Sequence, residues 1–324
     1  MLVTRTPVRV SFCGGGTDLA AFYRATELGG MVTSVALQAH IYVTVNDRFD
    51  DSIRVSYSQT ETVESFEDIE HELVRESMRI TGVTSGVEIT TIADIPGKGT
   101  GLGSSSSVTV GLLHALHTYA GRTVSSEQLA KEACEIEIDI LGQTIGKQDQ
   151  YAAAFGGLNQ ITFNSDETVA ITPSDADLSS LAENFCLVWT GLTRKATPIL
   201  EEQSRKTASK MDDLLSMRMQ AEEVSDLIEK GDWESVGSIL GEAWDLKRSL
   251  TSGISNSEID SLYDALMELG CTGGKLLGAG GGGFILVQTP PGVQEKIRTK
   301  LSNKVIPLVA DCDGSILLLD DRDV

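Results

Sequence analysis

Alternating apolar and polar residues predict strands at several places along the chain. In residues 8–12, valine and phenylalanine alternate with Arg9 and Ser11, and the pattern ends at three consecutive glycines. Similar alternation, or a short apolar run, predicts further strands at residues 41–46, 87–92, 185–189, 284–287 and 316–319.

Helical spacing of apolar residues predicts helices between these strands. From Val108 to Tyr119, apolar or small side chains recur every three or four residues and share one helical face. The same spacing predicts helices at residues 66–78, 129–141 and 259–267, and a largely helical region at 197–250. Because helices and strands do not alternate strictly, their order favours an α+β architecture over repeated βαβ units.

The length and charge of the chain limit the kinds of protein it can be. Its 324 residues are enough for two ordinary domains, and a polar stretch at residues 164–180 places the boundary between domains at 1–170 and 171–324. The net charge of −21 repels nucleic acid and anionic membranes, so we expect neither as a partner. A small anionic substrate needs only a local cluster of cations, and a homo-oligomer is compatible with the sequence.

The cysteines and the first residues bear on the compartment. Five cysteines are scattered without a C-x-x-C pair, which argues against a disulfide framework or a structural zinc site. The first twelve residues carry Arg5 and Arg9 in a strand-like stretch instead of the apolar core of a signal peptide. We therefore expect a cytoplasmic protein.

Residues 96–107, P-G-K-G-T-G-L-G-S-S-S-S, join a predicted strand to a predicted helix. Glycines let the backbone approach a ligand closely, and a helix N-terminus offers free N–H groups that suit a phosphate. The four serines can cap the helix, bind phosphate or reach a metal ion. We interpret the segment as a phosphate-binding loop, with simple helix capping as the alternative.

A second glycine-rich segment, G-G-K-L-L-G-A-G-G-G-G-F, covers residues 273–284. So many glycines indicate that the backbone presses against something, which could be a nucleotide, a substrate or the first glycine loop; a plain hinge is the alternative. The segment contains G-x-G-x-x-G, but a strand and not a helix follows it, which argues against a dinucleotide fold.

Charged residues with possible chemistry accompany the glycine loops. Arg9 lies in a strand that leads through a glycine turn to Thr17 and Asp18, where a cation and a carboxylate could meet reacting groups; an edge-strand arginine and a turn aspartate are the alternative. Asp149 precedes an apolar, small-residue stretch and could accept a hydroxyl proton, or cap a helix that starts near residue 151.

Three acidic residues lie at the end of the helix predicted at residues 129–141. Glu135, Glu137 and Asp139 oppose the helix dipole there, which invites a compensating cation such as Mg²⁺.

These motifs together, in this order, resemble those of the GHMP kinases, the family of galactokinase, homoserine kinase, mevalonate kinase and phosphomevalonate kinase. The resemblance covers nearly the whole chain. It implies an N-terminal domain like ribosomal protein S5 domain 2, a C-terminal ferredoxin-like domain and an active site between them. It also implies an enzyme that uses ATP and Mg²⁺ to phosphorylate a hydroxyl of a small molecule, or a phosphate in some members.

The resemblance assigns roles to individual positions. Asp149 is the implied base and Arg9 the implied cation near the reacting groups. Ser105 and Glu137 are the implied metal ligands, with Glu135 or Asp139 possible if the helix register differs. The ATP phosphates are expected at Pro96, Gly97, Lys98, Gly99, Gly101, Leu102, Gly103, Ser104, Ser105 and Ser106, although the loop is one residue longer than the common pattern.

Within the family, the wording G-G-G-T-D, G-K-Q-D-Q-Y and K-L-L-G-A-G-G-G-G-F is similar to that of D-glycero-D-manno-heptose 7-phosphate kinases. This implies transfer of the γ-phosphoryl group to O1 of a sugar phosphate. A kinase for a free sugar, like an L-fucose 1-kinase, and a catalytically silent sugar and ATP sensor are the alternatives. The expected substrate residues are Thr17, Asp18, Gln148, Arg194, Lys195, Lys247, Arg248, Gly280 and Gly281.

Overall fold

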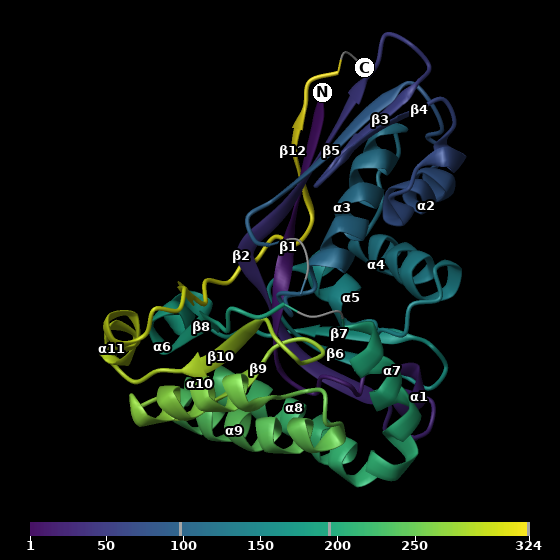
Figure 1. Cartoon of the computed structure of the whole chain (residues 1–324). Helices are drawn as coiled ribbons and strands as arrows, with labels where there is room; N and C mark the ends of the chain where they lie inside the picture. Colours follow the sequence, from purple (N-terminus) through teal and green to yellow (C-terminus); the bar gives the residue numbers. More distant parts are fainter. Residues whose placement is uncertain (97–98, 194–195, 323–324) are drawn as a thin grey trace.

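The structure is a computed structural model, and it describes residues 1–96, 99–193 and 196–322 (Figure 1). Its strands form two sheets, one of eight strands and one of four. In the larger sheet the order β12-β1-β2-β5-β3-β4 forms the main path, and β6 and β7 extend from β2. Its strands are β1 (Leu2–Cys13), β2 (Gly30–Asp47), β3 (Ile53–Ser56), β4 (Thr60–Val63), β5 (Val87–Ala93), β6 (Leu158–Phe163), β7 (Val169–Pro173) and β12 (Ile316–Asp320).

The longer helices of the first half of the chain lie together on one side of this sheet, whereas the short α1 lies beside α7 (Thr197–Lys206) (Figure 1). The long helix α3 packs directly on β1 and β2, and α2, α4 and α5 pack against α3. The packing positions the loop before α3 and the start of α5 next to β1. These helices are α1 (Ala20–Tyr23), α2 (Glu72–Thr81), α3 (Ser104–Tyr119), α4 (Ser126–Cys134) and α5 (Gln148–Phe155).

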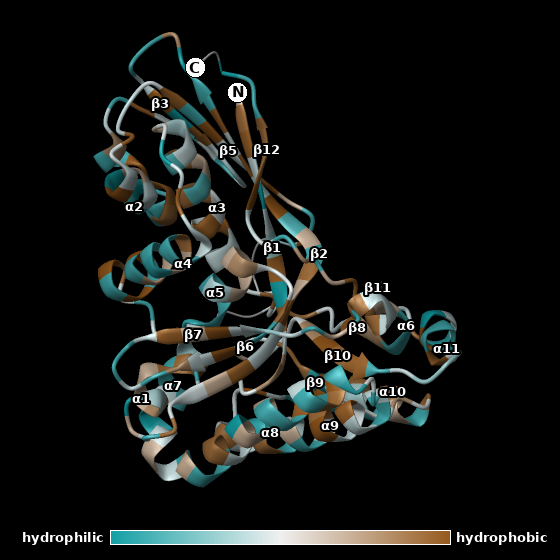
Figure 2. Ribbon diagram, turned by 180° about the vertical axis from the view of Figure 1, so that it is seen from behind, coloured by the Kyte–Doolittle hydropathy of each residue, from teal (hydrophilic) through white to brown (hydrophobic). Residues whose placement is uncertain are grey.

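The smaller sheet is antiparallel, with the order β11-β8-β10-β9. Helix α9 packs on β9 and β10, and α8 packs between α9 and the strands β1 and β2. Figure 2 shows that β10 is hydrophobic, whereas the peripheral helix α11 is largely hydrophilic. The elements are β8 (Phe185–Trp189), β9 (Gly273–Leu276), β10 (Phe284–Gln288), β11 (Val305–Pro307), α6 (Leu181–Asn184), α7 (Thr197–Lys206), α8 (Met211–Glu229), α9 (Trp233–Leu250), α10 (Ser257–Glu268) and α11 (Val293–Lys300).

One hydrophobic core joins the two sheets. Phe12 of β1 meets Phe185 of β8 edge to face, with ring centroids 5.5 Å apart, and Phe185 in turn contacts Trp233 of α9. Both phenylalanines are fully buried. Aromatic contacts of this kind add to the burial of apolar area, so the two halves of the chain are held against each other. In the part of the chain that the structure describes, none of the helices has the length and hydrophobicity needed to cross a bilayer.

The predicted polar boundary at residues 164–180 is only partly a linker. Val169–Pro173 forms β7, which pairs with β6, and the C-terminal strand β12 pairs with β1. Figure 1 accordingly shows the two termini at the same end of the molecule. The larger sheet therefore takes strands from both sides of residue 170.

The helix predicted at residues 129–141 changes type along its length. Helix α4 ends at Cys134, and Glu135–Ile140 continues as a π-helical turn. Such turns widen the helix and occur often at functional sites. The alternative in which Asp149 caps a helix starting near residue 151 is wrong, because α5 begins at Gln148 and Asp149 lies in its first turn.

The segment between β11 and β12, residues 308–315, bonds to the larger sheet; we call it the strap. The backbone N–H of Asp311 donates to the carbonyl of Ala36 at 2.9 Å, and that of Gly157 donates to the carbonyl of Asp311 at 2.7 Å. Farther along the strap, Gly314 packs on Gly156, where an added Cβ would lie 2.1 Å from the Gly314 nitrogen.

Gly156 and Gly157 offer a test of this packing. Both have φ near +70°, and Gly156 also has ψ −178°, a combination that only glycine adopts readily. We expect Gly157→Ala to lower the free energy of unfolding by about 1–2 kcal/mol, since its Cβ meets open space and only the left-handed backbone is strained. Gly156→Ala adds a clash with the strap and should cost more than about 3 kcal/mol. Urea unfolding of the two variants measures the difference; equal losses would contradict the close packing of the strap.

Candidate active site

The two glycine-rich loops touch through their backbones. A Cβ added to Gly278 would lie 2.5 Å from the Cα of Gly101, and one added to Gly283 would lie 2.4 Å from the carbonyl oxygen of Thr100. The N–H of Phe284 also donates to this carbonyl at 3.1 Å. The sequence left open whether the second loop presses against a nucleotide, a substrate or the first glycine loop. The structure shows the contact with the first loop.

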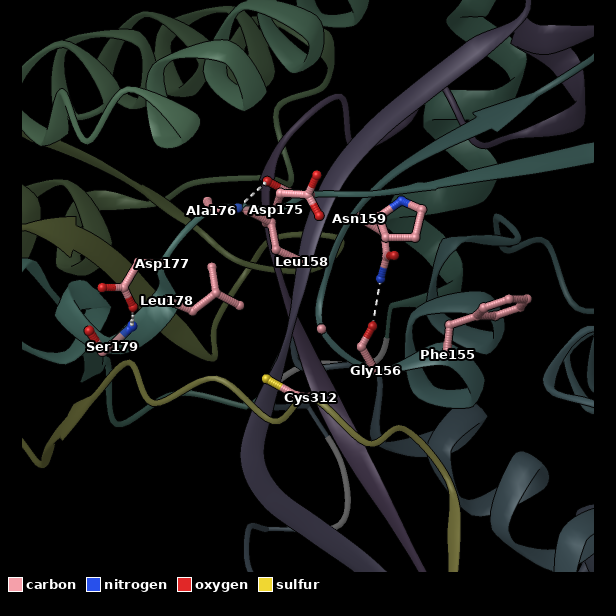
Figure 3. Close-up of a pocket in the computed structure, with 13 residues that line it drawn as sticks. Phe155, Gly156, Leu158, Asn159, Asp175, Ala176, Asp177, Leu178, Ser179 and Cys312 are labelled. Carbon is pink, nitrogen blue, oxygen red and sulfur yellow. Dashed lines mark hydrogen bonds between the residues drawn. The ribbon is translucent and has the colours of Figure 1, made fainter.

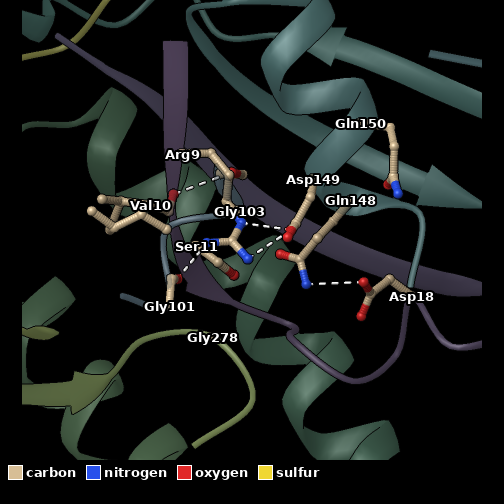
Figure 4. Close-up of polar contacts among 12 residues, drawn as sticks. Arg9, Val10, Ser11, Asp18, Gly101, Gly103, Gln148, Asp149, Gln150 and Gly278 are labelled. Atoms are coloured by element: carbon tan, nitrogen blue, oxygen red, sulfur yellow. Dashed lines mark hydrogen bonds and ion pairs between the residues drawn. The ribbon is translucent and has the colours of Figure 1, made fainter. Parts of the chain in front are cut away.

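Arg9 and Asp149 meet beside this contact (Figure 4). The Arg9 Nε donates to Asp149 Oδ1 at 2.7 Å, and its Nη1 donates to the carbonyl oxygen of Gly101 at 2.6 Å. The Arg9 side chain is only 5% exposed, whereas that of Asp149 is 24% exposed. A Cβ at Gly103 would approach the Asp149 carboxyl to 3.0 Å, so this glycine leaves room for the carboxylate. The pair joins β1, the first glycine loop and α5.

Asp18 and Gln148 form a second polar contact next to the pair (Figure 4). The Gln148 Nε2 donates to Asp18 Oδ2 at 2.9 Å, and the N–H of Gly16 donates to Oδ1 at 2.8 Å. Burial raises the pKa of Asp18, and the negative charge of Asp149 raises this pKa further. The structure thus brings together the predicted residues Arg9, Asp18, Gln148 and Asp149.

Thr17 has a different position from the predicted one. Its buried hydroxyl lies 2.8 Å from the carbonyl oxygen of Gly14 and 2.9 Å from that of Met31, and it accepts from the Met31 N–H at 3.0 Å. Backbone groups thus bind both the proton and a lone pair of this hydroxyl, and the residue is fully buried. Thr17 therefore holds the glycine turn, and the expected contact with a substrate hydroxyl does not fit this geometry.

Glu137 is buried next to the serines at the start of α3. Its Oε1 accepts from the Ser105 hydroxyl at 2.9 Å, and its Oε2 accepts from Gln150 Nε2 at 2.7 Å. Burial raises the pKa of Glu137 to about 7, although hydrogen bonds from Ser106, Gln150 and Ser105 work in the opposite direction. The arrangement presents one carboxylate and one hydroxyl as oxygen donors.

Glu135 and Asp139, two residues to either side of Glu137, are exposed. The π-helical turn thus directs one of the three acidic residues to the serines. Among the residues that the structure describes, no cluster of three or more histidine, cysteine, aspartate or glutamate side chains is arranged to hold a metal ion. Any metal here needs further oxygen ligands from a bound molecule.

The predicted pair Lys247 and Arg248 is split between two environments. Lys247 is buried, and its Nζ donates to the carbonyl oxygen of Gly278 in the second glycine loop. Arg248 is exposed and pairs with Asp245 at 2.7 Å on the surface of α9. Adjacent residues on a helix point in different directions, which explains the split. Arg248 therefore does not share the site with Lys247.

Lys275 is a site residue that the sequence analysis did not select. It is 2% exposed, and its Nζ donates to the carbonyl oxygens of Ser11 at 3.1 Å and Phe12 at 2.9 Å. The available signal was a cation inside an otherwise apolar, glycine-rich segment, G-G-K-L-L. Burial lowers the pKa of Lys275 to about 8.

Two further predicted residues pack on the chain itself. Gly281 donates its N–H to the carbonyl oxygen of Ile254 at 2.8 Å, and a Cβ at Gly280 would lie 2.7 Å from the Ile254 Cα. Their glycine character thus serves the packing of the loop, and substrate contact is not needed to explain it. The predicted residues Gly97, Lys98, Arg194 and Lys195 lie outside the described residues.

The first loop leads into α3 beside Arg9. Gly103 precedes the helix with φ +73°, and the carbonyl of Leu102 accepts from the Arg9 N–H at 3.0 Å. Helix α3 has 16 residues, so its first N–H groups and its dipole favour an anion at this end. The site therefore combines an anion-binding helix end, a carboxylate oriented by a guanidinium, and a buried carboxylate beside serine hydroxyls. These are the elements that phosphoryl transfer requires, namely charge neutralisation and positioning.

A cavity of about 530 Å³ lies beyond the far end of α5 (Figure 3). Its lining includes Phe155, Leu158, Asp175 and Cys312, and none of the candidate site residues. It is therefore separate from the site around Asp149.

Comparisons with known proteins identify the family of the chain. Residues 67–157 match the GHMP kinases N terminal domain and residues 224–307 match the GHMP kinases C terminal domain. The chain is 29% identical to the D-glycero-alpha-D-manno-heptose 7-phosphate kinase of Campylobacter jejuni, over 89% of each chain. It is 24% identical to the L-fucokinase/L-fucose-1-P guanylyltransferase of Bacteroides fragilis, over 92% of this chain and 36% of that protein.

The fold is also similar to that of solved kinase structures. A D-glycero-D-manno-heptose 1-phosphate kinase from Bacteroides thetaiotaomicron superposes with a TM-score of 0.83 over 99% of this chain and 100% of that chain, at 24% identity. The expected family, its two-part α+β fold and the expected class of enzyme, an ATP-dependent kinase, are confirmed. The chain belongs to the GHMP kinase family.

Proposed function

We propose that this protein is a sugar kinase that transfers the γ-phosphoryl group of ATP to O1 of D-glycero-D-manno-heptose 7-phosphate. The product is the 1,7-bisphosphate, an intermediate suited to the synthesis of nucleotide-activated heptose. The observation that carries the proposal is the Arg9–Asp149 pair, which is bonded to Gly101 at the contact between the two glycine loops.

The first loop and the start of α3 are the proposed site of the ATP phosphates. The described residues Gly99 to Ser106 surround a helix end whose N–H groups and dipole favour anions. Arg9 of β1 donates to the Gly101 carbonyl and so holds the loop against this strand. The phosphates would therefore lie within reach of the Arg9–Asp149 pair.

Glu137 and Ser105 are the proposed ligands for Mg²⁺. Carboxylate and hydroxyl oxygens are the donors that Mg²⁺ prefers, and sites of this kind usually complete the shell with water and substrate phosphates. The raised pKa of Glu137 fits a carboxylate buried without its cation. Bound there, Mg²⁺ would neutralise charge on the phosphates.

Asp149 is the proposed acceptor of the sugar's proton. The O1 oxygen of the sugar attacks the γ-phosphorus and forms the new P–O bond. The bond between the γ-phosphorus and its bridging oxygen breaks, and the electron pair leaves with ADP. The O1 proton passes to the Asp149 carboxylate, which Arg9 orients through Oδ1.

The choice of acceptor rests on the motif wording and on the relative named a heptose 7-phosphate kinase. A similar solved structure is named a heptose 1-phosphate kinase, and another relative is named an L-fucokinase. We therefore expect an ADP-release assay to rank heptose 7-phosphate above heptose 1-phosphate, L-fucose and galactose, with phosphorus NMR locating the new phosphate on C1. A higher kcat/KM for a free sugar would reject the proposed acceptor.

Replacing Asp149 tests the proposed base. Asp149→Asn keeps the size of the side chain and removes its ability to take a proton, so kcat should fall about 1,000-fold. The affinity for a nonhydrolysable ATP analogue should change only a fewfold, as calorimetry can show. Asp139→Asn removes the same charge from an exposed position and should retain normal turnover. An unchanged kcat in Asp149→Asn would remove this residue from the mechanism.

Glu137 should give the folded protein a distinctive pH dependence when metal is removed with a chelator. Because burial raises the pKa of Glu137 to about 7, the folded protein keeps this proton where the unfolded chain has lost it. Stability therefore falls as the pH rises from about 5 to about 7, by up to about 3 kcal/mol.

In Glu137→Gln this loss should be absent, as urea unfolding at several pH values would show. Glu135→Gln removes an exposed acid from the same helical turn and should keep the wild-type pH dependence. A parallel pH dependence of Glu137→Gln and the wild type would contradict the buried carboxylate.

A further inference from the structure

Three buried cations lie where the two halves of the chain meet. Arg9 of β1 bonds to the Gly101 carbonyl, Lys247 of α9 bonds to the Gly278 carbonyl, and Lys275 of β9 bonds to two carbonyls of β1. As whole residues they are 4%, 4% and 2% exposed. We call these three residues the seam cations. Two of them hold the carbonyls of the two glycines that touch each other, Gly101 and Gly278.

Only Arg9 has a carboxylate partner among the residues that the structure describes. It pairs with Asp149, whereas the two seam lysines have only carbonyl acceptors. A buried charge is costly unless it is paired, and a carbonyl dipole compensates an ammonium less well than an anion does. The seam therefore favours the entry of an anion.

Lys247 is the seam cation with the most unused hydrogen-bonding capacity. An ammonium has three N–H donors, and the described residues supply Lys247 with one acceptor, the Gly278 carbonyl oxygen. The groups that face it are Lys275 on β9, Arg9 on β1, Asp18 after the glycine turn and Asp149 on α5. With these four groups and Lys247 itself ionised, the cluster holds three cations and two carboxylates, which leaves an excess of one positive charge.

The position of Lys247 points to the transferring phosphate. Lys247 donates to the carbonyl of Gly278, and Gly278 packs against Gly101. The Gly101 carbonyl accepts from Arg9, and Arg9 also pairs with the proposed base, Asp149. The neighbouring Arg248, which was also expected among the substrate residues, faces solvent on another side of the helix. The anion nearest Asp149 during the reaction is the phosphoryl group in transit.

We propose that the Lys247 ammonium binds an oxygen of the phosphoryl group as it passes from the nucleotide to the sugar hydroxyl, so that α9 supplies a catalytic cation. The proposal rests on the proposed kinase function and adds to Arg9 a second cation, which contacts the phosphoryl group itself. The bonds formed and broken are those given above. Lys247 keeps its proton throughout and stabilises the negative charge of the transition state.

Neutral and charged replacements of Lys247 test the proposal. Lys247→Met removes the charge with little change of volume and should lower kcat about 100-fold, the effect of losing one preorganised donor. Lys247→Arg keeps the charge and should recover part of this loss. Arg248→Met makes the same change of net charge on the next residue of α9 and should leave kcat within about twofold.

Thermal unfolding of each variant separates chemistry from folding. The expected result is a Lys247→Met protein that stays folded at the assay temperature, because loss of the buried charge offsets part of the cost of leaving the Gly278 carbonyl without its donor. A kcat of Lys247→Met within tenfold of the wild type, per folded molecule, would overturn the proposal. So would a Lys247→Arg protein no more active than Lys247→Met.

Proton uptake provides a second test that needs no sugar. Burial, and next the surrounding cations, lower the pKa of Lys247 well below its usual range, and an arriving anion raises this pKa again. Binding of a nonhydrolysable ATP analogue near pH 8, measured by calorimetry in buffers of different ionisation enthalpy, should take up more protons in the wild type than in Lys247→Met. Equal uptake would count against the proposal.

The same measurement separates the two proposals. If the wild type phosphorylates none of the sugars tested but loses proton uptake on Lys247→Met substitution, the proposed acceptor is wrong and the role of Lys247 stands. If the wild type phosphorylates heptose 7-phosphate and Lys247→Met does so at an undiminished rate, the function stands and the role of Lys247 is rejected.

Discussion

The backbone contact between two glycine loops is the constraint on which the rest of the site depends. Gly101 and Gly278 approach so closely that neither position accepts a Cβ. The contact brings the N-terminus of α3 against the C-terminal half. Because both residues are glycines, they have no side chains that could bond to their own buried carbonyl groups. Arg9 and Lys247 supply the missing donors. The glycines and the buried cations therefore depend on each other. The close approach of the two backbones buries carbonyl groups, and these carbonyls need hydrogen-bond donors at the seam.

Two carboxylates of the site differ in character because their surroundings differ. Asp149 is bonded to a guanidinium and remains partly exposed, so one face of its carboxyl group is open to solvent. Glu137 is enclosed by hydroxyl and amide donors with no cation of its own among the described residues, and burial raises its pKa to about 7. The first environment suits a proton acceptor in contact with an arginine, and the second suits a carboxylate that awaits a metal ion. The separation of these roles follows from local hydrogen bonding.

The sequence predicted most strands and helices that have a clear period, together with both glycine loops. It missed β3, β4, β6, β7, β9 and β11, because a short strand carries little pattern. It also missed the pairing of β12 with β1, because a sheet partner depends on distant residues. The choice of Glu137 over its two acidic neighbours depends on a π-helical turn that a regular helical count does not contain. Lys275 was missed because its carbonyl partners on β1 are brought near only by the packing of the two sheets.

The seam also determines where this strongly acidic chain places positive charge. The acceptors of its three cations include backbone carbonyls, namely those of Gly101 and Gly278 and two carbonyls of β1. The net charge of −21 repels anions at long range, but the three seam cations are buried together, where a local cluster outweighs distant, screened surface charge. The overall charge of the surface therefore does not determine what the site can bind.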